Sequence, residues 1–304
     1  MASFKNLVDK KIALFDRVPD EMATQSERAQ REIWKKIRPL LDDMDVDLNG
    51  NITQSDSNVN RIGIIVEELN KVIAGSEYKD AVKSFLGSID EGVNLTNEIA
   101  VKIQSTFEPT NAQLKLLQIS RNNAINAFFG SGLRERVTQP FLEQLTANVA
   151  ARAPLRDAVK ALETVIVGDE NVDGRLLANV KTSAITAQSI ADRSYSASVN
   201  ETIGVQWYEY VGGEIPTTRN FCRNREDGIY HVKEIEQWGS GKNSGGIEDI
   251  VDGTWAGRIN GTDRKSIFTF VGGWNCRHQF MPIMEQDVPD SVKLRAKKEG
   301  FYKE

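Results

Sequence analysis

The stretch VQWYEYV at residues 205–211, followed by Gly212 and Gly213, divides the sequence into two parts of different character. It is aromatic and β-branched, so it predicts a β-strand that ends at a glycine turn. Residues 1–203 contain few glycines and carry apolar residues at helical spacing, which predicts a series of long helices. Residues 204–274 hold 13 of the 23 glycines and four of the five tryptophans. We therefore place a domain boundary at residue 203.

The predicted fold class is α+β and predominantly α. A helical arm or bundle is expected over residues 1–203, a small Gly- and Trp-rich α+β module over 204–289, and a short basic tail, mostly exposed, over 290–304. The sequence SIFTFV at 266–271 alternates with period two and predicts a second strand. Three tryptophans are expected to form the core of the module: Trp207, Trp238 and Trp274.

Composition narrows the class of protein. The chain has 304 residues, 40% hydrophobic and 27% charged, which is typical of a folded globular protein. Its formal net charge of −5 disfavours a protein that coats nucleic acid through bulk charge. Apolar runs such as residues 62–66 are far too short to span a bilayer, so no membrane partner is expected. The first residues lack the apolar core of a secretory signal, which predicts synthesis in a cytoplasm.

The cysteines and histidines lie close together in the sequence. The chain has two of each, and all four fall between residues 222 and 278: Cys222, His231, Cys276 and His278. Cys276 and His278 are two residues apart, on one side of an extended segment. With Cys222 and His231 they would complete a tetrahedral zinc site. The alternative is that the cysteines are packed apolar thiols and the histidines are structural.

A second candidate metal site lies in the helical part. The sequence DVDLNGNITQSD at residues 45–56 follows the calcium-loop pattern through its glycine. Calcium would take oxygen ligands from five residues: Asp45, Asp47, Asn49, Asn51 and Asp56. The last position holds aspartate, whose carboxylate is shorter than the usual glutamate. The alternative is a turn between two helices, which Asp, Asn and Gly favour without an ion.

The tail carries a small basic cluster in an otherwise acidic protein: Lys293, Arg295, Lys297 and Lys298. These side chains would contact DNA phosphates or an acidic partner surface. The alternative is a solvated helix face.

One set of residues in the second part carries a resemblance to a known family. The set is Tyr210, Gly212, Thr218-Arg219, Phe221-Cys222, Gly228, Tyr230, Glu234-Ile235, Trp238, GGWNCRH at 272–278 and Pro282. It resembles the C-terminal module of phage Mu F-like minor head proteins, the phage head morphogenesis family. The resemblance covers about Gly204 to Glu285. Many members have a cysteine where Arg225 stands and a last cysteine where His278 stands, which leaves Cys222, Cys276 and His278 to act together.

The resemblance implies a structural protein and no reaction. It predicts a virion protein present in a few copies, at the portal vertex or inside the head. Such a protein is made in the host cytoplasm and acts in head morphogenesis, with DNA packaging or ejection as further steps. The implied partners are the phage portal protein, the major capsid protein or both, with contact to packaged DNA.

A different class of function also follows from the Cys/His cluster. A metal-dependent nuclease or hydrolase would hold zinc there and use His231 or His278 as its base, with Asp227 or Glu234 as a nearby carboxylate. Because the chain has two histidines and both are already candidate ligands, this enzyme is difficult to assemble. The structural protein is therefore the preferred interpretation.

Overall fold

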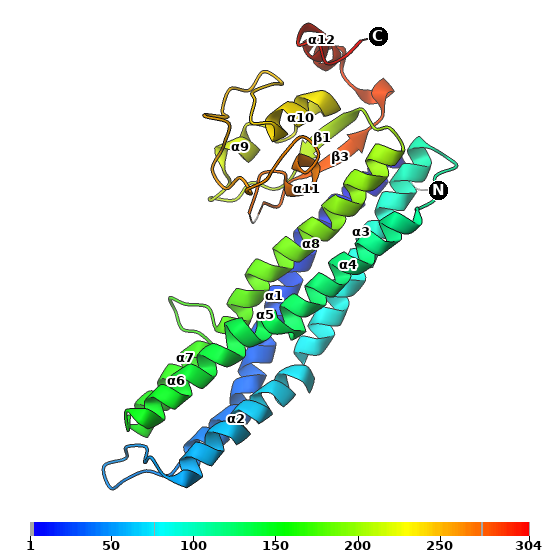
Figure 1. Ribbon diagram of the computed structural model, residues 1–304. Helices are drawn as coiled ribbons and strands as arrows, with labels where there is room; N and C mark the ends of the chain where they lie inside the picture. The colour runs from blue at the N-terminus through cyan, green and yellow to red at the C-terminus, as the bar shows by residue number, and fades with distance from the viewer. Residues whose placement is uncertain (1–2, 76, 275, 304) are drawn as a thin grey trace. The chain divides into compact units, whose positions relative to one another are not determined.

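The computed structural model describes residues 3–75, 77–274 and 276–303 (Figure 1). The longer helices of the first part are α1 (Phe4–Asp42), α2 (Asp56–Gly75), α3 (Glu77–Ile103), α4 (Asn111–Phe129), α6 (Gln139–Ala150), α7 (Leu155–Ile166) and α8 (Arg175–Thr202). The short helix α5 (Ser131–Leu133) and the π-helical turn η1 (Arg134–Thr138) join α4 to α6. None of the described helices is both long enough and apolar enough to cross a membrane.

Short elements make up the second part of the chain. Its strands are β1 (Trp207–Val211), β2 (Ile229–His231) and β3 (Gln279–Ile283). Its helices are α9 (Asn220–Arg223), α10 (Val232–Gly239), α11 (Ile267–Phe270) and α12 (Asp290–Lys298), with a 3-10 turn η2 (Glu285–Asp287) before the last. The long helical N-terminal region and the small sheet confirm the predicted α+β fold, predominantly α.

Backbone contacts group the chain into two compact units. The mixed unit combines residues 1–17, 88–121 and 185–304, and the helical unit combines residues 18–87 and 122–184. Residues 204–304 therefore share a unit with three helical segments, whereas the sequence placed a boundary at residue 203. Both units include residues from four helices: α1, α3, α4 and α8. Helical periodicity cannot predict a division between units that falls inside a continuous helix.

The helical unit has an aromatic and aliphatic core. Helix α2 buries the apolar stripe that its sequence predicts, through Ile65, Leu69, Val72 and Ile73. Phe85 meets Phe128 edge to face, with ring centroids 5.2 Å apart. The Tyr78 hydroxyl donates to the backbone carbonyl of Phe128 at 3.1 Å, which satisfies a buried polar group inside this core.

A buried ion pair joins three helices within the mixed unit. The ammonium of Lys11 on α1 lies 3.0 Å from Asp192 Oδ1 on α8, and both side chains are almost fully buried. The same ammonium donates to the hydroxyls of Thr96 on α3, at 2.6 Å, and Ser196 on α8, at 2.7 Å. Because a buried charge that loses its partner is costly, this network fixes the register of the three helices against one another.

The sheet of the mixed unit is antiparallel, with strand order β2-β1-β3. On central strand β1, Tyr208 lies opposite Tyr230 of β2 and Pro282 of β3. Tyr210 lies opposite Phe280 of β3. One face of the sheet packs against a core that contains Phe221, Tyr230, Ile235, Trp238, Trp255, Ile267, Val271 and Phe280.

The guanidinium of Arg225 is the polar centre of this core. It is fully buried and lies 3.8 Å from the ring centroid of Phe221 and 4.5 Å from that of Trp238. It also donates two hydrogen bonds to the carboxylate of Asp249, each at 2.8 Å. Cation–π contacts and a bidentate ion pair together compensate the desolvation of the charge. They hold α9, α10 and the loop around residue 249 in one arrangement.

Two predictions about the module are wrong. Residues 267–270 form the short helix α11, because the Asp263 carboxylate accepts from the backbone N–H groups of Lys265 and Ser266 and starts a helical turn. The third strand of the sheet is instead Gln279–Ile283. Trp274 is not in the core, since 56% of it is exposed. The core tryptophan of this region is Trp255, which stacks on Phe221 at 4.3 Å.

We predict that Arg225→Ala destabilises the module by about 3–5 kcal/mol, because it leaves Asp249 without its partner and opens a cavity between two rings. Urea denaturation followed by tryptophan fluorescence measures this, since four of the five tryptophans lie between residues 207 and 274. The control is Lys5→Ala, which removes the exposed Lys5–Asp9 pair and is expected to change the unfolding free energy by less than ~0.5 kcal/mol. Equal effects of the two substitutions would contradict the central role of Arg225.

Candidate metal centre

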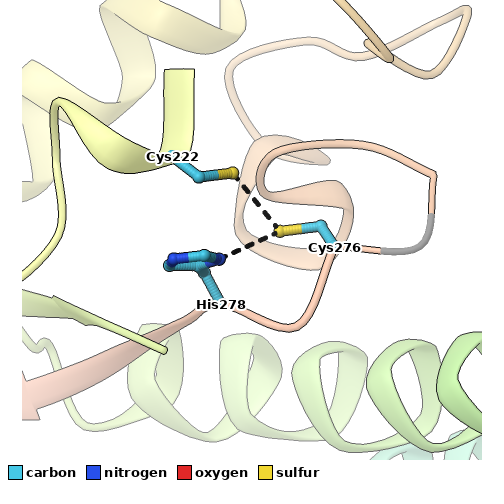
Figure 2. A group of neighbouring side chains, drawn as sticks. All are labelled: Cys222, Cys276 and His278. Atoms are coloured by element: carbon cyan, nitrogen blue, oxygen red, sulfur yellow. Dashed lines mark hydrogen bonds between the residues drawn. The ribbon is translucent and has the colours of Figure 1, made fainter. Parts of the chain in front are cut away.

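Three of the four predicted zinc ligands come together in the mixed unit (Figure 2). Cys222 lies on the short helix α9, Cys276 lies in the loop after α11, and His278 directly precedes β3. The Sγ atoms of the two cysteines are 3.7 Å apart, and Cys276 Sγ lies 3.9 Å from His278 Nδ1. One ligand atom from each residue lies within 4.8 Å of the others, so this cluster could hold a metal ion.

The cluster is closed to solvent. The exposed fraction is 2% for Cys222, 5% for Cys276 and 3% for His278. The imidazole of His278 stacks on the ring of Tyr210 from β1, with centroids 5.2 Å apart and an interplanar angle of 20°. The Tyr210 hydroxyl donates to Cys222 Sγ at 3.3 Å. Tyr210 of the sheet therefore contacts two of the three ligands, His278 and Cys222, and fixes their orientation.

Two glycines allow this close approach. A Cβ at Gly272 would clash with Cys222 Sγ and would lie 2.9 Å from Cys276 Sγ. A Cβ at Gly212 would lie 2.7 Å from two ring carbons of His278. Larger residues at these positions would displace the ligand side chains, so both glycines serve the packing of the cluster.

The pKa values of the two thiols are shifted in opposite directions. The hydrogen bond from the Cys222 thiol, with help from His278 and Arg193, lowers the pKa of Cys276 well below its ordinary value. The same thiol–thiolate contact, together with burial, raises the pKa of Cys222. These opposite shifts favour a thiolate at Cys276 and a protonated thiol at Cys222. A metal ion would displace the proton of Cys222, since metals bind cysteine as thiolate.

The outer groups around the cluster also suit metal binding. His278 Nε2 is buried without a hydrogen bond in the described part of the chain, and it lies 3.9 Å from the Glu226 carboxylate. Histidine ligands commonly pair their second nitrogen with a carboxylate, which orients the ring. Burial raises the pKa of Glu226. If the distance between the Glu226 carboxylate and His278 Nε2 shortened to that of a hydrogen bond, the histidine would have such a carboxylate partner.

His231 is not part of the cluster. It caps the N-terminus of α10: its Nδ1 accepts from Lys233 N–H at 3.3 Å, while its own N–H donates to Glu234 at 2.7 Å. Its ring meets Trp207 edge to face at 4.9 Å. The prediction that His231 completes the zinc site is therefore not supported. As a helix cap, this histidine already has a structural role.

Glu234 is likewise engaged. Its fully buried carboxylate pairs with Arg295 of α12, at 3.0 Å from Nε, and Arg295 also donates to the Ile229 carbonyl. The basic tail is therefore packed on the module along one face, where Ala296 is fully buried, and is not wholly solvated. Asp227, the other carboxylate considered for catalysis, is exposed and lies outside the cluster.

The predicted calcium loop is a hydrogen-bonded turn between α1 and α2. The Asp47 carboxylate accepts from the N–H groups of Asn49 and Asn51, both at 2.9 Å, and these contacts lower its pKa. The Asp45 carboxylate accepts from Ser55 at 3.2 Å. Among the residues that the structure describes, Asp45, Asp47 and Asp56 do not gather at metal-ligand distances. These contacts are those of a turn that Asp and Asn form readily, and the calcium site stays a prediction.

Several residues that shape the cluster were not singled out by their sequence. Arg193 on α8 donates to the Cys276 carbonyl, and Glu226 faces His278. Gly212 was predicted only to end a strand and Gly272 was noted only as part of a family pattern; neither prediction linked these glycines to the cluster. The contact of Arg193 spans 83 residues, so no local pattern indicates it.

Comparison with known proteins identifies no relative. No protein-family model, no curated protein and no solved structure matches the chain. The resemblance to the phage head morphogenesis family therefore stays a prediction.

The cap position of His231 makes stability depend on pH. Burial lowers its pKa to about 4. An unfolded histidine titrates near ~6.5, so on acidification the unfolded chain takes up this proton before the folded chain does, and stability falls as pH drops from ~6.5 towards 4. We predict that His231 accounts for about 1.5 kcal/mol of lost stability between pH 6.5 and 5.

The matched variant is His231→Asn, which keeps a side-chain acceptor at the cap but does not titrate. Urea unfolding of both proteins at pH 6.5 and 5 gives the difference directly, because all other titrating groups are shared. An equal pH dependence in the two proteins would show that His231 is not buried in its neutral form.

Proposed function

We propose that this protein is a structural minor head protein of a tailed bacteriophage, located at the portal vertex or inside the head. It would bind the portal protein, the major capsid protein or both during head morphogenesis, with contact to packaged DNA. The resemblance of Gly204–Glu285 to the phage head morphogenesis family supports this assignment. The observation that favours a structural role over a catalytic one is the burial of the Cys/His cluster.

We further propose that the metal is zinc. Two sulfurs bound to one tetrahedral zinc at about 2.3 Å lie about 3.8 Å apart, and a sulfur and a nitrogen lie about 3.6 Å apart. The cluster has 3.7 Å between its sulfurs and 3.9 Å between Cys276 Sγ and His278 Nδ1, which are close to these values. All three ligand atoms lie within 4.8 Å of one another, so zinc would draw Cys222 and His278 together by up to about 1 Å. Thiolate and imidazole are also the ligands that structural zinc prefers.

Access to the cluster weighs against the hydrolase alternative. A catalytic zinc needs an open coordination position that substrate can reach. Here all three ligand residues are buried, and the cavity beside Cys276 has a volume of only about 20 Å³. A cavity of that size holds about one water molecule, which could complete the coordination of zinc but leaves no room for a phosphodiester. Zinc would instead connect α9, the loop after α11 and the start of β3.

We predict that protein purified without chelator carries about one zinc per chain and that Cys276→Ser loses it. Gly272→Ala is expected to weaken zinc binding by at least tenfold, since a methyl group would push the two sulfurs apart. Gly213→Ala is the control, because a Cβ there meets no atom within 4 Å. Elemental analysis and competition with a chromogenic chelator measure both. Protein free of metal, with normal stability, would favour packed thiols.

The assembly role has its own test. Mass spectrometry of purified virions from the phage that encodes this chain is expected to find the protein in a few copies per particle. Co-expression with the portal protein is expected to yield a complex that co-elutes in size-exclusion chromatography. Absence from mature particles together with no portal or capsid complex would overturn the proposed function.

A further inference from the structure

The sequence contains two Asn-Gly dipeptides, Asn49-Gly50 and Asn260-Gly261. Asparagine is a thermolabile residue, and a following glycine makes it more reactive, because no Cβ hinders attack of the glycine nitrogen on the asparagine carboxamide. Space is open at both glycines, since a Cβ at either would meet no atom within 4 Å. The hydrogen bonds of the two glycine N–H groups therefore distinguish the dipeptides.

Asn260 and Gly261 form the exposed tip of a turn in the mixed unit. Thr262 closes this turn, since its backbone N–H and its hydroxyl donate to the Ile259 carbonyl at 3.1 and 2.6 Å. The tip itself is unattached: among the residues that the structure describes, neither the carboxamide of Asn260 nor the N–H of Gly261 has a hydrogen-bond partner. The attacking nitrogen and the attacked carboxamide are thus both free.

The Asn49-Gly50 dipeptide of the helical unit is held by hydrogen bonds. The Gly50 N–H donates to the Asp47 carbonyl at 3.0 Å, and the Gly50 carbonyl accepts from the Leu155 N–H at 3.0 Å. The Asp47 carboxylate also accepts from the N–H groups of Asn49 and Asn51, both at 2.9 Å. The nitrogen that would attack is engaged here, so the reaction requires local opening of a closed turn first.

We propose that Asn260 is a site of spontaneous deamidation in the folded protein and that Asn49 is protected. The Gly261 nitrogen forms a bond to Cγ of Asn260, the carboxamide C–N bond breaks, and ammonia leaves with the proton of the Gly261 N–H. The product is a five-membered cyclic imide. Water then opens the imide at either carbonyl, which gives aspartate or isoaspartate. The reaction consumes water alone and depends neither on zinc nor on the proposed function.

The isoaspartate product is expected to disturb the contacts of Arg258. The guanidinium of Arg258 donates to the carbonyls of Gly239 at 2.8 Å and Thr262 at 2.7 Å. It also donates to the carbonyl of Gly253. Isoaspartate inserts a methylene group into the backbone between Ile259 and Thr262, which moves the Thr262 carbonyl away from Arg258. A change at the surface thus reaches a side chain that joins three loops of the module.

Prolonged incubation of the full-length protein in neutral buffer, followed by tryptic peptide mapping, tests the proposal. Cleavage after Arg258 and Arg264 releases the peptide INGTDR, in which Asn260 is the sole asparagine. Asn49 lies in the tryptic peptide of residues 37–61, where fragmentation locates the modified position. Deamidation raises the mass by about 1 Da, and electron-transfer fragmentation distinguishes aspartate from isoaspartate.

We expect Asn260 to deamidate at least ~5-fold faster than Asn49 in the folded protein, because hydrogen bonds that must open first reduce the reactive population. The unfolded protein is the control. In guanidinium chloride both turns are lost, so the rates at the two asparagines are expected to agree within about twofold. Equal rates in the folded protein, or an unreacted Asn260 after a period in which the unfolded protein reacts, would overturn the assigned site.

A matched variant tests the consequence for Arg258. Asn260→Gln keeps an exposed carboxamide, but its cyclisation would need a six-membered ring, so deamidation at this position is expected to stop. After the same incubation the thermal midpoint of the unmodified protein is expected to fall by about 2–4 °C, whereas that of Asn260→Gln stays constant. An incubated protein that contains isoaspartate at position 260 and keeps its midpoint would overturn the effect on Arg258.

Discussion

The ion pair between Arg225 and Asp249, enclosed by the rings of Phe221 and Trp238, is the interaction on which the module depends. Arg225 lies two residues after the end of α9, and its backbone N–H donates to the Cys222 carbonyl at 3.0 Å. The position of Cys222 is thus tied to a fully desolvated charge. A cation–carboxylate pair therefore holds the turn that follows α9.

The Cys/His cluster then depends on three constraints of different kinds. Helix α9 supplies Cys222, the sheet supplies the ring of Tyr210 on which His278 stacks, and two glycines leave space for sulfur and imidazole. This geometry favours one thiolate and one protonated thiol, because two buried thiolates 3.7 Å apart would repel each other strongly. If any one of these constraints were removed, the same three residues would be present, but the distances between their sulfur and nitrogen atoms would no longer suit a metal ion.

The sequence predicted the class of fold and three of the four candidate zinc ligands, because both depend on local features. Helical periodicity, the aromatic strand at 207–211 and the rarity of cysteine and histidine are all visible in one chain. His231 was misassigned because proximity in sequence does not show that a ring faces away to cap a helix. The calcium pattern at 45–56 stays a prediction; backbone N–H groups of Asn49 and Asn51 already bind the Asp47 carboxylate, which a sequence pattern does not show. The prediction of a strand at 266–271 was wrong because the Asp263 carboxylate accepts from the N–H groups of Lys265 and Ser266 and forms a turn just before this segment, which a six-residue alternation does not show.

The spacing of the two cysteines has a consequence for how the protein is made. Cys222 and Cys276 are separated by 54 residues, and His278 follows the second cysteine. During translation Cys222 leaves the ribosome well before its partners exist, at about 5–20 residues per second. Closing a loop of this length has an entropic cost that contacts inside the loop must offset first. The ligand set therefore comes together only after the intervening segment has folded, so an intact cluster shows that synthesis has passed residue 278 and that residues 222–278 have folded.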